Sequence, residues 1–119
     1  MSTFGFTASE WQAAKQEIRD LLVQRCKVRG MIAYSELVAH LTTVSVEPHD
    51  PRLFHLLGEV SRDEDAAGRG MLTSIVVHKT GDMEPGPGFF ELAQQLGRDT
   101  SDLTKCWIEE VKIVHAQYA

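Results

Sequence analysis

The chain has 119 residues, of which 43% are apolar and 24% are charged, and its formal net charge at pH 7 is −5. These values predict one globular domain spanning residues 1–119, able to bury a core of its own. No apolar run approaches the roughly 18 residues that cross a bilayer, and the first residues lack the basic start and apolar stretch of a secretion signal. We therefore expect a cytoplasmic protein that makes no membrane contact.

The first expected helix begins near Thr7 and ends at about residue 28. Thr7 and Glu10 have the spacing of a capping box, in which the hydroxyl and the carboxylate each accept a free backbone amide. Apolar residues then recur at helical spacing, and basic residues followed by Gly30 are typical of a helix end. Three short segments follow this helix: an edge strand at 31–33, a two-turn helix at 34–41, and a loop or extended link at 42–48.

The next helix has a sharp start, because Asp50 can cap it and Pro51 suits the first helical position. It should extend to Asp65. The apolar run from Met71 to His78 predicts the longest strand of the chain. A turn at 80–82 and a rigid Pro-Gly corner at 85–88 then lead to a helix at 89–96. Thr100 or Ser101 should cap the last helix, and its inner face is expected to carry Leu103, Trp107, Val111, Val114 and Tyr118.

This order predicts an α+β, mostly helical fold with a winged helix-turn-helix-like core over residues 7–98. A small sheet of two or three strands would join the helices, and two C-terminal helices would follow, the last within 99–119. The helix from Pro51 would be the third of the core, and the turn after His78 would be the wing. The alternative is a small α+β bundle with a two-stranded ribbon and no role in binding nucleic acid.

The segment Ile32 to Val38 resembles the "tYgeiA" segment of the alkyltransferase-like DNA-repair domain, which is a winged helix. Leu53 to Val60 is similar to its "RAVG" segment, and Leu72 to Val77 falls on its "PCHRVV" strand. This resemblance covers about residues 18–90 and implies the fold. It also argues against alkyl transfer, because Thr73 stands at the reactive cysteine. Ser74 and Ile75 replace the neighbouring histidine and arginine, and the recognition-helix arginine falls on or near Leu53. The pattern from Leu72 through Phe90, followed by a helix that contains Trp107, also resembles a small family of uncharacterised bacterial proteins, and that resemblance supplies no known activity.

No cofactor or metal is expected. The five histidines lack the HxxxH or HxH spacing of metal ligands, and the phosphate-binding glycine motifs are absent. Cys26 and Cys106 are isolated, so we interpret both as reduced packing residues. The backbone amides of residues 88–90 at a helix start could attract an anion, although the corner itself explains the glycines.

Charge distribution separates the candidate partners. Residues 1–58 balance to zero, so all the excess negative charge lies in residues 59–119. A DNA-binding winged helix would place basic and imidazole side chains against the nucleic acid. The residues for that role are Arg52, His55, Arg62, His78 and Lys79. An acidic surface could instead complement a basic protein partner. The residues for that role are Asp63, Glu64, Asp65, Asp82 and Glu84.

We expect a macromolecule-binding protein without catalysis, and the acidity favours a protein partner in an accessory, antitoxin or immunity role. A winged-helix DNA-binding regulator is the alternative. A small enzyme of unknown reaction is a second alternative, because Glu47, His49 and Asp50 place two carboxylates beside an imidazole. The simpler interpretation of that segment is a loop that ends in a helix cap. The sequence does not indicate an oligomeric state.

Overall fold

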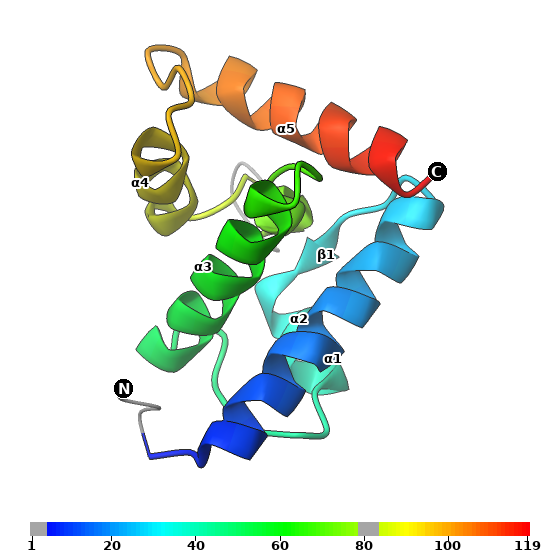
Figure 1. Cartoon of the computed structure of the whole chain (residues 1–119), viewed down its shortest axis with the longest axis vertical. Coiled ribbons are helices and arrows are strands. Elements are labelled where there is room, and N and C mark those ends of the chain that lie inside the picture. The colour runs from blue at the N-terminus through cyan, green and yellow to red at the C-terminus, as the bar shows by residue number, and fades with distance from the viewer. Residues whose placement is uncertain (1–4, 79–83) are drawn as a thin grey trace.

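Helices α1 and α3 lie side by side, and α5 runs across the ends where both helices finish (Figure 1). The computed structural model describes residues 5–78 and 84–119. Its helices are α1 (Ala8–Lys27), α2 (Tyr34–His40), α3 (Pro51–Ala66), α4 (Pro87–Gln95) and α5 (Leu103–Gln117). Two short strands, β1 (Ile32–Ala33) and β2 (Val76–Val77), complete the α+β, mostly helical class that the sequence predicts.

The start of α1 is the predicted capping box. The Thr7 hydroxyl accepts the Glu10 amide at 3.0 Å, and the Glu10 carboxylate accepts the Thr7 amide at 2.8 Å. The helix ends in a Schellman motif, since the Gly30 amide donates to the Arg25 carbonyl at 2.9 Å. The left-handed residue of that motif is Arg29, with φ of 52°, and not the neighbouring glycine.

Loss of the α1 cap should cost stability without changing the fold. Thr7→Ala removes a cap hydroxyl, and a lost cap of this kind costs about 1 kcal/mol of unfolding free energy. Ser9→Ala is the matched control, because Ser9 lies exposed in the same first turn and is not the cap. Urea denaturation of both variants tests this, and equal midpoints would contradict the assigned cap.

Helix α3 also begins as predicted. The Asp50 side chain accepts the Arg52 amide at 2.9 Å, and Pro51 occupies the first turn. The helix ends in a second Schellman motif, in which the Arg69 amide donates to the Glu64 carbonyl at 3.0 Å and Gly68 is left-handed. The chain therefore turns sharply at Gly68 and enters the buried segment that follows.

The prediction of a strand from Met71 to His78 is largely wrong. Residues Leu72–Ile75 form a fully buried 3₁₀-helix, and of this segment only Val76 and Val77 form a strand. This turn contacts α1, α3 and α5, so it is surrounded by helices and has no strand partner for its own backbone in the described residues. A continuous apolar run shows that a segment is buried but does not distinguish a buried turn from a strand.

The two C-terminal helices exist, but the predicted face of α5 is partly wrong. Asp102, not Thr100 or Ser101, caps α5, and Leu103 is 48% exposed. The face that packs inward centres on Cys106, Glu110 and Val114. The buried face includes Glu110, whose carboxylate pairs with Arg98 at 3.1 Å, and a pattern of apolar residues does not mark a buried glutamate.

The sheet is two-stranded and parallel, with Ile32 opposite Val76 and Ala33 opposite Val77. It joins the segment before α2 to the segment after α3. The predicted wing falls on the turn after His78, and residues 79–83 lie outside the described part of the chain. None of the described helices has the length and apolarity needed to cross a membrane.

Candidate functional site

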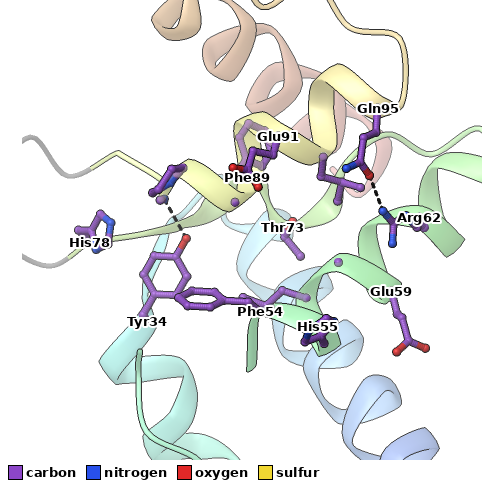
Figure 2. A pocket seen from close by; sticks show the side chains of 16 residues that line it. Tyr34, Phe54, His55, Glu59, Arg62, Thr73, His78, Phe89, Glu91 and Gln95 are labelled. Carbon is purple, nitrogen blue, oxygen red and sulfur yellow. Dashed lines mark hydrogen bonds between the residues drawn. The ribbon is translucent and has the colours of Figure 1, made fainter. Parts of the chain in front are cut away.

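A pocket of about 530 Å³ opens between α3 and α4 (Figure 2). Its size lies within the range of ligand sites in proteins. Helix α2, helix α3, the 3₁₀-helix and the Pro-Gly corner all contribute side chains to it. The residues that matter below are Tyr34, Phe54, His55, Leu57, Glu59, Arg62, Thr73, His78, Gly86, Phe89, Glu91, Leu92 and Gln95.

Aromatic rings form one end of this α3–α4 pocket. The Tyr34 and Phe54 rings meet edge to face, with centroids 6.3 Å apart and planes at 79°. The His78 ring lies 5.1 Å from the Tyr34 ring, and Phe89 stands on α4 across the pocket (Figure 2). Phe54 is 45% exposed although its side chain is large and apolar. This end therefore offers ring surface to whatever enters.

The Pro-Gly corner is held against this aromatic end. The Gly86 amide donates to the Tyr34 hydroxyl at 3.0 Å. A Cβ added at Gly86 would lie 3.4 Å from His78 Nε2 and 3.5 Å from the Tyr34 oxygen, so even a methyl group there would touch both side chains. Burial raises the pKa of Tyr34, and its phenol is neutral at physiological pH.

Polar groups form the other end and the floor. Arg62 donates to the Gln95 side chain at 2.6 Å and links α3 to α4. On the floor, the Thr73 and Ser61 hydroxyls are 2.5 Å apart. Glu59 accepts the Trp11 indole N–H at 2.8 Å and lies 3.4 Å from Lys15 Nζ. The exposed Glu91 carboxylate makes no hydrogen bond or ion pair with another side chain in the described part of the chain.

The structure brings three of the predicted nucleic-acid residues together at this pocket: His55, Arg62 and His78. Arg52 lies apart from them. Its guanidinium donates to the Asp50 carboxylate at 2.6 Å and sits 4.9 Å from the centroid of the Phe6 ring. Lys79 lies outside the described residues.

The predicted acidic set does not form one open surface. Asp63 pairs with Lys15 at 2.8 Å, and Asp65 pairs with Arg98 at 2.5 Å. Glu84 accepts the Thr104 hydroxyl at 3.3 Å, and Asp82 lies outside the described residues. Glu64 is only 1% exposed, so its carboxylate acts inside the protein.

Glu64 is the centre of a buried ionic cluster that the sequence pattern does not reveal. Its carboxylate accepts hydrogen bonds from Arg19 of α1, from Arg69 after α3, and from the Tyr118 hydroxyl at 2.6 Å. Burial alone would raise the pKa of Glu64, but these three donors hold it below the usual value. The cluster therefore ties α1, α3 and the end of α5 together.

In the segment that could form a small enzyme site, Glu47 to Asp50, one of the residues has a structural role. Asp50 caps α3 and accepts hydrogen bonds from the Arg52 guanidinium, and these bonds lower its pKa to about 2. A carboxylate that stays ionised at such a pH is a poor general base. Neither His49 nor Asp50 lines the α3–α4 pocket.

This assignment predicts the acid titration of Asp50. Its side-chain ¹³C resonance, followed by NMR, should titrate with a pKa of about 2. In Arg52→Ala the pKa should rise toward the ordinary value of 3.8 because the strongest donor is gone. Arg62→Ala serves as the control, since Arg62 bonds Gln95 instead. An unchanged titration in Arg52→Ala would rule out the guanidinium as the cause.

The two cysteines have a packing role, and the described residues contain no metal-binding group. Cys26 and Cys106 are free and buried, and burial raises the pKa of the Cys26 thiol to about 11. Burial also raises the pKa of Cys106. Both thiols are therefore protonated and unreactive at neutral pH. Among residues 5–78 and 84–119, no three His, Cys, Asp or Glu side chains are grouped closely enough to hold a metal ion.

Sequence reasoning did not select the aromatic residues of the pocket as site residues. Two of them stand in segments that the sequence had already singled out: Tyr34 lies in the segment that resembles the alkyltransferase-like domain, and Phe89 follows the Pro-Gly corner. No sequence feature singled out Phe54 or Glu91. Comparison of the chain with protein-family models, curated proteins and solved structures found no match.

Proposed function

We propose that this chain is a non-catalytic binding protein that holds a segment of a protein partner in the α3–α4 pocket. An accessory, antitoxin or immunity role is the setting that such a protein suits. The observation that carries the proposal is the exposed Phe54 beside an open pocket with apolar and aromatic walls. Buried aromatic anchors in pockets supply most of the binding energy at protein interfaces.

The charge of the chain supports a basic partner. The net charge is −5, and long-range attraction would speed the approach of a positive protein surface. The internal pairing of Asp63, Glu64 and Asp65 moves the expected contact away from the end of α3. The carboxylates that lie at the pocket itself are Glu59 and Glu91.

Selection from a phage-displayed library of random twelve-residue peptides tests this function, because a random library requires no identified partner. We expect enriched peptides that combine a basic residue with apolar residues. Phe54→Ala should weaken their binding by about tenfold, as expected for loss of an aromatic anchor. Ile108→Ala is the matched control, because Ile108 is 42% exposed and lies on α5 outside the pocket. Failure to enrich any peptide, or equal binding by Phe54→Ala, would contradict the proposal.

The second candidate is a winged-helix DNA-binding regulator, and one arrangement favours it. His55, Arg62 and His78 all line the α3–α4 pocket, and the resemblance to the alkyltransferase-like domain implies a winged helix there. Binding to a 20-base-pair duplex, measured by fluorescence anisotropy, should then fall steeply as salt rises. At a fixed salt concentration, Arg62→Ala should bind the duplex more weakly than the wild type. Undetectable binding at low salt would remove this candidate.

A further inference from the structure

We propose that the aromatic end of the α3–α4 pocket binds a lysine side chain of the partner, with the ammonium group directed at Glu91. This inference rests on the proposed function and specifies the chemistry of the partner. The arrangement that carries it is an aromatic-walled pocket with one carboxylate at its edge that the protein leaves unpaired in the described residues.

Four rings line the aromatic end, of which Phe54 and His78 are exposed and Tyr34 and Phe89 are buried. Tyr34, Phe54 and His78 lie on one side, with ring centroids 5.1 to 6.3 Å from one another in adjacent pairs. Phe89 stands opposite them on α4 (Figure 2). Aromatic rings attract a cation electrostatically, and the attraction grows as water is excluded. The same walls can pack against the four methylene groups of a lysine stem.

The charges around the pocket distinguish a cation from an anion. With histidine counted as neutral, the ionised side chains that line the pocket are Glu59, Glu91 and Arg62. Arg62 is held at the far end by Gln95, and Glu59 is already close to Lys15. Glu91 lies on α4, two residues after Phe89, and both residues line the pocket (Figure 2). The charge left to satisfy at that end is therefore negative.

Lysine fits this end better than arginine. The Tyr34 hydroxyl already accepts the Gly86 amide, and the Phe54 and Phe89 rings carry no acceptor atoms, so the aromatic walls offer few hydrogen-bond acceptors. A guanidinium carries five N–H donors in a planar fork, whereas an ammonium is a compact charge at the end of an apolar stem. A pocket with aromatic walls and a single free carboxylate matches the ammonium group and apolar stem of lysine.

Titration of the ¹⁵N-labelled protein with three end-blocked amino acids tests the inference. The probes are the N-acetyl, N-methylamide forms of lysine, arginine and norleucine, where norleucine keeps the stem and lacks the charge. We expect the lysine probe to shift the amide signals of residues 54, 78, 89 and 91, and to bind about fivefold more tightly than norleucine. The arginine probe should bind more weakly than lysine.

Glu91→Gln should weaken lysine binding by about two- to fivefold, the value of an exposed ion pair, and leave norleucine binding unchanged. Glu109→Gln is the control, since Glu109 is an exposed glutamate of α5 outside the pocket. Norleucine binding as tightly as lysine, or arginine binding most tightly, would overturn the lysine inference and leave the peptide-binding function standing. Absence of binding by all three probes together with failure of the peptide selection would overturn both.

Discussion

Replacement of Glu64 by alanine should lower the free energy of unfolding by about 3 kcal/mol, the lower end of the range for a broken buried ion pair. The variant leaves Arg19, Arg69 and the Tyr118 hydroxyl without their common acceptor. The two arginine side chains are 34% and 36% exposed, so water can solvate them in part, and this limits the loss.

Asp63→Ala is the control for this prediction. Asp63 is the neighbouring residue of α3, and its ion pair with Lys15 involves a carboxylate that is 67% exposed. Pairs of that kind contribute about 0 to 1 kcal/mol. Urea denaturation of the two variants should therefore give clearly different midpoints. Equal losses would show that burial does not set the importance of the Glu64 cluster.

The same cluster predicts the acid limb of the stability curve. The folded-state pKa of Glu64 is lowered, so its contribution is fully present above the unfolded pKa of about 4.3 and is lost as pH falls through the folded value. The difference in unfolding free energy between the wild type and Glu64→Gln should therefore shrink as the pH falls through that range. A difference that does not vary with pH there would show that the charge of Glu64 is not what the cluster uses.

Replacement of Gly70 by alanine is expected to lower the free energy of unfolding by a similar amount, about 3 kcal/mol, for two separate reasons. Gly70 has φ of +89°, and a left-handed backbone costs a residue with a Cβ about 1 to 2 kcal/mol. An added Cβ would also lie 2.7 Å from Ile113 Cγ2 of α5. Overpacking of that kind costs about 1 to 3 kcal/mol.

Gly68→Ala separates these two contributions. Gly68 also has a positive φ, +78°, but a Cβ there would meet nothing within 4 Å. It should therefore lose only the backbone part, about 1 to 2 kcal/mol. Amide hydrogen exchange should show faster opening of α5 in Gly70→Ala and not in Gly68→Ala. Equal stabilities of the two variants would mean that Ile113 of α5 moves aside for the added Cβ at no measurable cost in stability.

The starts of α1 and α3 were predictable because the information lies within a few residues of each start. Thr7 and Glu10 are three positions apart, and Asp50 is next to Pro51, so each cap forms without help from distant parts of the chain. The pocket was not predictable in this way. Phe54 and Glu91 line it only because α3 and α4 pack together, and no local pattern sets a helix pair at that position.

The same contrast explains the acidic residues after Arg62. As a sequence, Asp63-Glu64-Asp65 is typical of a solvated negative surface. In the folded chain, Lys15, Arg19 and Arg98 pair with these three carboxylates from distant segments. The 3₁₀-helix at Leu72–Ile75 is a similar case, because contact with three helices decides how that apolar run folds.

Local patterns in the chain were enough to predict the α+β class and the first three helices. Those features depend on periodicity, caps and spacing, which act between residues close together in the chain. The side chains buried together at Glu64, and those that surround the α3–α4 pocket, became known from the folded structure alone. Those groupings depend on contacts between residues such as Glu64 and Tyr118, or Tyr34 and Gly86, which the packing of whole helices brings within hydrogen-bond distance.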